Sequence, residues 1–192
     1  MSYHIYTTEG IILKRTPFGE ANILVHVLTQ DLGLIMASAR SARLYVSKLR
    51  PALQEYAHVS VSCIKGKGGW KITNVVSKGS FYFESPKYAH RVMSQVTTVL
   101  MKMIQGETPH KEVFEIVKGG FTFLKNVKED LVSDFEILIV LRILKELGYV
   151  VNDEDTNAFL GNEWSDELLI KINISKKSIV AVVNKALKES QL

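Results

Sequence analysis

The sequence predicts an α+β fold in which a five-stranded β-barrel is followed by an all-α helical bundle. Up to about residue 80, short segments rich in β-branched residues alternate with glycine-containing turns, which is typical of a small all-β domain. After Gly79, apolar residues recur at the three- and four-residue spacing of amphipathic helices. We therefore expect a barrel domain over residues 1–80 and a helical domain over residues 81–192.

Five strands account for the first 80 residues. The segment Lys65–Gly69 between the last two strands contains three glycines and suits a hairpin loop. An open sheet of this size would expose bare edges that a closed barrel removes, so we expect a closed barrel of the OB-fold type. The predicted strands are Gly10–Arg15, Ala21–Thr29, Gly33–Ala39, Tyr56–Ile64 and Trp70–Ser77.

Four helices are expected in the second part. Ser85-Pro86 and Thr108-Pro109 are typical helix starts, because the fixed φ of proline suits a first turn. Ser133 and Glu136 have the spacing of a capping box. The helix after them is apolar on nearly every side, which predicts a buried central helix. The first helix ends at Gly106, the second runs to Leu124, the third is Phe135–Leu147, residues 150–166 form a polar loop, and the last helix is Ser175–Ser190.

Charge is distributed unevenly along the chain. Residues 1–80 hold ten Lys or Arg and four acidic residues, whereas residues 81–192 hold fourteen and sixteen, within a net charge of +4. A basic first domain beside a slightly acidic second one favours a module that binds a polyanion. Solvated surface is the alternative interpretation of the same charges.

Few residues suggest bond chemistry. Cys63 is the one cysteine, so neither an internal disulfide nor a cysteine-based zinc site can form, and its strand context predicts a small buried hydrophobe. Lys65–Gly69 lacks the pattern of a phosphate loop, and the five histidines lack metal-ligand spacing. We expect no enzyme activity, catalytic residue, cofactor, metal or small-molecule substrate. With no secretory signal and no apolar run of about 18 residues, we expect a cytoplasmic protein that does not bind membranes.

The segment Arg40–Arg50 is the strongest candidate for contact with a nucleic acid. It contains four basic residues and Tyr45 and no acidic residue. Arg and Lys bind phosphates without regard to sequence, and an aromatic ring can stack on an unpaired base. Alternatively, Tyr45 and Leu49 pack on the barrel, and Trp70 is expected in the core. The candidate DNA-binding residues are Lys14, Arg15, Arg40, Arg43, Tyr45, Lys48, Arg50, Lys65, Lys67 and Lys71.

The order of short motifs from Gly10 to Val76 resembles the N-terminal domain of the RecO family. That family has an apolar strand followed by a basic-x-Pro-aromatic-x-Glu segment, a strand before a glycine turn, a basic Gly-Ala-Arg-like loop, Leu-x-Pro-Phe, and a Gly-basic-Gly hairpin. Glu55 departs from the pattern because it stands where proline is usual. The matching segments are Leu13–Glu20, Val27–Thr29 with Leu32-Gly33, Ala39–Arg43 with Ser47–Arg50, Leu53–Tyr56, and Gly66-Lys67-Gly68.

The helical part resembles the same family at Leu141–Tyr149, a helix that ends in Leu-Gly-Tyr. Many members then carry a four-cysteine zinc site. This chain has no cysteine after Cys63, so the resemblance implies a short form without that site, in which residues 150–166 are held in another way.

The resemblance implies a DNA repair and homologous recombination mediator of the RecFOR pathway. Such a protein binds single- and double-stranded DNA, anneals complementary strands, engages single-strand-binding protein and acts with RecR to load RecA. Another OB-fold module, binding RNA or associated with the ribosome, remains the alternative.

Overall fold

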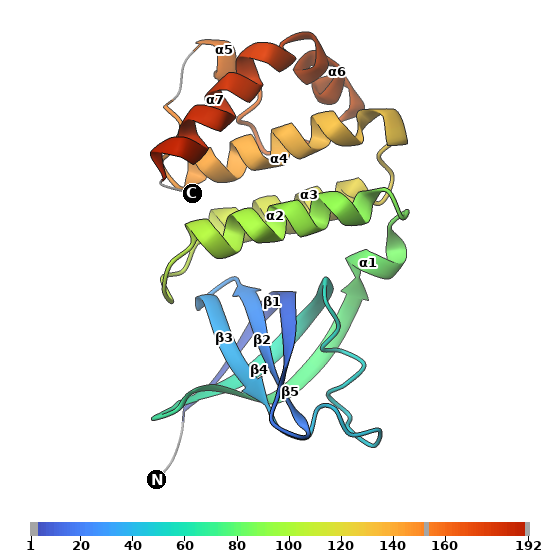
Figure 1. Ribbon diagram of the computed structural model, residues 1–192, viewed down its shortest axis with the longest axis vertical. Helices are drawn as coiled ribbons and strands as arrows, with labels where there is room; N and C mark the ends of the chain where they lie inside the picture. The colour runs from blue at the N-terminus through green and yellow to red at the C-terminus, as the bar shows by residue number, and fades with distance from the viewer. Residues whose placement is uncertain (1–3, 152–153, 191–192) are drawn as a thin grey trace. The chain divides into compact units, whose positions relative to one another are not determined.

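The computed structural model describes residues 4–151 and 154–190, which divide into two compact units (Figure 1). The first unit contains residues up to Glu84 together with Gln105–Lys111, and the second contains Ser85–Ile104 and the residues from Glu112 onward. Gln105–Lys111 returns to the first unit and packs closely against Gly33. A Cβ atom on Gly33, whose φ is +73°, would lie 2.3 Å from the Thr108 carbonyl oxygen, so only glycine fits there.

The first unit is a closed barrel with the strand order β1-β2-β3-β5-β4 (Figure 1). All its strand pairs are antiparallel except β3 with β5, which pair in parallel at Ala37–Trp70 and Ser38–Lys71. Alternate residues fill the interior, including Val25, Ile35 and Val61. The predicted closed five-stranded barrel is therefore confirmed. The strands are β1 (Ile5–Phe18), β2 (Asn22–Thr29), β3 (Gly33–Ala39), β4 (Ala57–Gly66) and β5 (Gly69–Ser80).

The first strand is much longer than the sequence pattern predicted. β1 pairs with β4 from Ile5 to Ile11 and with β2 from Gly10 to Phe18, and its register shifts between Ile12 and Lys14. Because this strand changes partner along its length, its polar ends are held by backbone hydrogen bonds that hydropathy does not reveal.

The second unit is helical, and the expected central helix is confirmed. In α4 (Val132–Glu146), every residue from Leu138 to Leu144 is buried, and α2, α6 and α7 pack around this helix. The other helices are α1 (Phe81–Glu84, in the barrel unit), α2 (Ala89–Met103), α3 (Lys111–Leu124), the 3₁₀ turn η1 (Glu129–Leu131), α5 (Glu154–Asn157), α6 (Asp166–Ile174) and α7 (Lys176–Glu189). None of the helices in the described parts of the chain is long and apolar enough to cross a membrane.

Several predicted helix boundaries were wrong. The capping box at Ser133 and Glu136 does not form, because α4 begins one turn earlier through η1. The Ser133 hydroxyl instead accepts a hydrogen bond from Lys176, and Glu136 forms an ion pair with Arg91. α2 and α3 begin after their expected Ser-Pro and Thr-Pro starts. α1, α5 and α6 were not predicted; the four residues of α5 lie within the expected loop 150–166.

A buried arginine holds the polar segment that precedes α6. The Arg142 side chain, only 2% exposed, donates from Nε to the Phe159 carbonyl oxygen at 2.8 Å and from Nη2 to that of Glu163 at 2.7 Å. Its guanidinium carbon lies 4.3 Å from the centre of the Trp164 ring, which packs against Phe123 and Phe135. Burial lowers the pKa of Arg142 to about 10. Arg142 of α4 thereby holds the segment before α6 by hydrogen bonds, and no cysteine ligand is needed there.

The close packing of α3 on the same tryptophan gives a stability prediction. A Cβ atom on Gly120 would lie 2.6 Å from Ile139 Cδ1 and 3.1 Å from the Trp164 ring. We expect Gly120→Ala to lower the free energy of unfolding by about 1–2 kcal/mol, since overpacking outweighs the better helix propensity of alanine. Urea unfolding followed by circular dichroism measures this change. Gly68→Ala is the control, because no atom lies within 4 Å of the added methyl group, and equal effects of the two variants would contradict the packing account.

Candidate nucleic-acid interface

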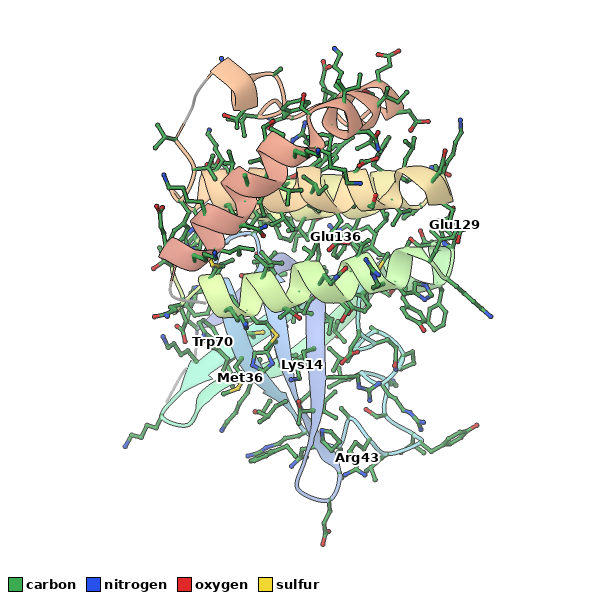
Figure 2. All side chains as sticks on the ribbon, turned by 45° about the horizontal axis from the view of Figure 1, so that its top comes forward. Lys14, Met36, Arg43, Trp70, Glu129 and Glu136 are labelled. Carbon is green, nitrogen blue, oxygen red and sulfur yellow. The ribbon has the colours of Figure 1, made fainter. Side chains whose placement is uncertain are left out.

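The outer face of β1, β2, β3 and β5 presents lysines at both of its sides. Strand pairing places Lys14, His26 and Met36 in one row across three strands. The adjacent row runs from Thr16 through Leu24 and Ser38 to Lys71. Figure 2 labels Lys14 and Met36 on the barrel. This outward face of the central strands is the surface that OB-folds use to bind oligonucleotides.

His26 lies between these residues and adds little positive charge at neutral pH. Burial, and next the nearby positive charge of Lys14, lower the pKa of His26 below its usual 6.5. His26 and Met36 were not among the predicted site residues. Their outward positions in the strand alternation are the sequence signal that identifies them.

Residues 40–56, which we call the β3–β4 connector, carry the largest group of exposed cations in the barrel unit, four of its nine exposed Lys and Arg residues. The connector is tied to the β1–β2 turn: Arg43 donates from its backbone N to the Ala21 carbonyl oxygen (2.9 Å) and from Nη1 to that of Gly19 (3.1 Å), and the Ser41 N–H donates to Asn22 Oδ1 (2.9 Å). Figure 2 shows Arg43 beside this turn at one end of the barrel. The exposed cations of the connector are Arg40, Arg43, Lys48 and Arg50.

The apolar residues of the connector were expected either to pack on the barrel or to be exposed for contact with a nucleic acid, and the structure separates these two interpretations. Leu49 packs against the barrel core, as one alternative expected. The side chain of Tyr45 is 92% exposed, so packing on the barrel was the wrong expectation for it. Trp70, 6% exposed, belongs to the core as predicted.

Arg15 lies away from the face that carries Lys14. Its Nη1 donates to Gln54 Oε1 at 2.5 Å, and its backbone N–H donates to Glu55 Oε1 at 3.0 Å. Adjacent residues of a strand point to opposite sides, so Lys14 and Arg15 do not share a surface. Arg15 instead lines a cavity of about 300 Å³ with Tyr56, Tyr82 and Phe83.

The two lysines of the β4–β5 hairpin differ in their surroundings. Lys65 Nζ lies 2.5 Å from Glu107 Oε2 and 5.3 Å from the centre of the Trp70 ring. The hydrogen bond from Lys65 lowers the pKa of Glu107, so the carboxylate stays charged and offsets the lysine. Lys67 is exposed at the tip of the hairpin. Lys67 therefore offers more positive charge to an approaching polyanion than Lys65 does.

Cys63 is buried in β4, as its sequence context predicted. Burial raises the pKa of its thiol to about 11. At pH 8 only about one thiol in a thousand is then ionised in the folded protein, and thiolate is the reactive form. Within the described residues, no group of three or more His, Cys, Asp or Glu side chains is arranged to hold a metal ion.

We expect Cys63 to react with a thiol reagent such as 5,5′-dithiobis(2-nitrobenzoate) only when the barrel unfolds. Release of the coloured product at pH 8 should be slow in buffer and should complete within minutes in 6 M guanidinium chloride. Fast labelling of the folded protein would show that β4 opens readily, contrary to its buried position.

The fold and its surface define a class of protein: an OB-like barrel with basic residues on one face and on an adjacent connector, followed by a helical unit. Residues 1–81 match the family model described as recombination protein O N terminal. The barrel domain belongs to the RecO family of DNA repair proteins, which confirms the resemblance found in the sequence.

Curated relatives support this assignment. The chain is 28% identical over 150 residues to the DNA repair protein RecO of Thermodesulfovibrio yellowstonii, covering 76% of this chain and 58% of that protein. It is 25% identical over 148 residues to RecO of Heliobacterium modesticaldum (76% and 52% covered) and 30% identical over 113 residues to RecO of Gloeothece citriformis (58% and 40%). The chain thus spans about half the length of the curated relatives that it matches.

Proposed function

We propose that this protein is a non-enzymatic mediator of DNA repair and homologous recombination. It binds single- and double-stranded DNA without sequence preference, anneals complementary strands, and helps to load RecA onto DNA coated by single-strand-binding protein. RecR and single-strand-binding protein are its proposed protein partners, as the family membership implies.

The distribution of charge on the barrel unit is the observation that carries this proposal. From Leu32 to Gln54 the chain has no acidic residue, and it presents the four exposed cations of the connector. Lys14 and Lys71 add positive charge on the neighbouring strands. Cations in this arrangement neutralise phosphates and release condensed counterions, which gives affinity for any nucleic-acid sequence.

Binding of the DNA phosphates is sufficient for strand annealing. Two complementary strands repel each other through their phosphates, and a cationic surface reduces this repulsion while it raises their local concentration. Annealing makes and breaks no covalent bond, so the proposed activity needs no nucleophile, general base or metal. Arg15 lies away from the face that carries Lys14, and the charge of Lys65 is offset by Glu107. The predicted cations that carry the proposal furthest are therefore Arg40, Arg43, Lys48, Arg50, Lys14, Lys67 and Lys71.

An annealing assay tests the proposed function. Two complementary oligonucleotides, one with a donor and one with an acceptor dye, are mixed with and without the protein, first bare and then coated with single-strand-binding protein. We expect the protein to accelerate pairing in both cases without ATP. A protein that binds RNA preferentially and leaves DNA annealing unchanged would instead be the alternative OB-fold module, and turnover of DNA or ATP abolished by a single substitution would make it an enzyme.

A further inference from the structure

The tip of the β3–β4 connector is apolar and faces solvent. Leu44, Tyr45 and Val46 are 47%, 92% and 83% exposed, respectively. Three consecutive large apolar side chains in water carry a free-energy cost that a partner relieves by covering them. We call Leu44–Val46 the connector tip.

The connector tip is held in place by the residues on both sides of it. Backbone hydrogen bonds from Leu44 to the Ser41 carbonyl oxygen and from Ser47 to that of Leu44, both 3.1 Å, form consecutive turns. Arg43 fastens one end to the β1–β2 turn, and Leu49 packs on the barrel core at the other end. Binding at a tip that is already ordered loses less conformational entropy than binding at a flexible loop.

Positive charge surrounds the connector tip on both sides in the sequence. Arg40 and Arg43 precede it, and Lys48 and Arg50 follow it. The nearest acidic residues along the chain are Asp31 and Glu55. The connector therefore offers exposed apolar side chains with phosphate-binding cations before and after them in the chain, which complements stacked bases between two charged backbones.

We propose that the connector tip is a wedge that enters the base stack of DNA whose phosphates are held by the surrounding cations. Tyr45 stacks on a base through its ring, while Leu44 and Val46 fill the space between neighbouring bases, as apolar wedges do when they partly unstack a duplex. The proposal rests on the proposed function, because the cations must first bind the DNA. Partial unstacking by the wedge lowers the cost of opening the neighbouring base pairs, and an opened pair can exchange its partner for an incoming strand.

Fluorescence of 2-aminopurine in a short duplex tests the wedge, since this base brightens when it is unstacked. With the protein at saturation we expect a rise of about twofold or more. The double variant Tyr45→Ala with Val46→Ser should abolish the rise and weaken binding about tenfold. Its plot of log affinity against log salt should keep the slope of the unaltered protein, because the phosphate contacts are unchanged.

Two further variants are the controls for this experiment. Tyr45→Phe keeps the ring and should preserve the fluorescence rise. Phe83→Ala removes an aromatic side chain that is also exposed but lies in α1, outside the connector, and should change neither signal.

The possible outcomes separate the wedge from the proposed function. If the unaltered protein binds DNA with the expected salt dependence but the duplex stays stacked, the wedge proposal fails alone. If it binds no DNA, both proposals fail. If the tip variant loses binding to vesicles of phosphatidylcholine and phosphatidylserine while duplex unstacking persists, the tip is a membrane contact and the wedge proposal is overturned.

Discussion

Replacing Arg40, Arg43, Lys48 and Arg50 by glutamine is expected to weaken DNA binding on the order of a thousandfold at 0.1 M salt. Each phosphate contact on duplex DNA contributes about 0.9 to the slope of log affinity against log salt. Losing up to four contacts lowers that slope by about three to four. Because no base edge is read, the loss should be the same for oligonucleotides of unrelated sequence. Fluorescence anisotropy of a labelled duplex at several salt concentrations measures both quantities.

A charge-matched variant is the control for this experiment. Lys102, Lys128, Lys171 and Lys177 are exposed on the helical unit, and their replacement by glutamine removes the same charge. This variant should lose at most about tenfold in affinity, because none of the four lysines belongs to the proposed interface and exposed charges that do not contact the DNA are screened by salt. Since Arg43 also donates to the Gly19 carbonyl oxygen, circular dichroism should first show that the connector variant is folded. Equal losses in the two variants would mean that overall charge, and not the connector, determines binding.

The variant Arg142→Ala is expected to lower the free energy of unfolding by about 3–5 kcal/mol. Two carbonyl groups, those of Phe159 and Glu163, would lose their donor, at about 1–3 kcal/mol each. The contact with the Trp164 ring would also be lost, and a cavity would replace the buried guanidinium stem. Urea unfolding followed by circular dichroism and by tryptophan fluorescence measures this loss.

Arg91→Ala is the matched control, because Arg91 is exposed and its guanidinium lies 3.6 Å from the Glu136 carboxylate. An exposed ion pair of this kind contributes up to about 1 kcal/mol. If Arg142→Ala were no more destabilising than Arg91→Ala, the segment before α6 would be held by something other than Arg142.

Local patterning predicted the strands and helices whose pairing partners are close in sequence. β2, β3 and the β4–β5 hairpin follow their expected bounds within a few residues, because alternation and turn glycines reflect the same local geometry. The ends of β1 and the start of α4 depart from expectation because they depend on distant partners. Hydropathy carries no information on a strand that changes partner or on a 3₁₀ turn that extends a helix.

The candidate interface was only partly accessible to sequence reasoning. Exposed basic residues in the connector could be recognised because the segment lacks acidic residues. The ion pair of Lys65 with Glu107 could not be predicted from the sequence, since the two residues are brought together only by the return of Gln105–Lys111 to the barrel unit. The role of Arg142 has a signal in the sequence, because one arginine inside an otherwise apolar helical stretch requires a buried partner.

The salt dependence of strand annealing is the most direct test of the claim that phosphate binding by the barrel unit is the activity. The annealing rate and the DNA affinity of the unaltered protein should be measured side by side from about 0.05 to 0.5 M potassium chloride. The account predicts that acceleration of annealing declines in parallel with phosphate-driven binding and disappears with it. Acceleration that persists at salt concentrations where binding is lost, or that requires ATP, would contradict it.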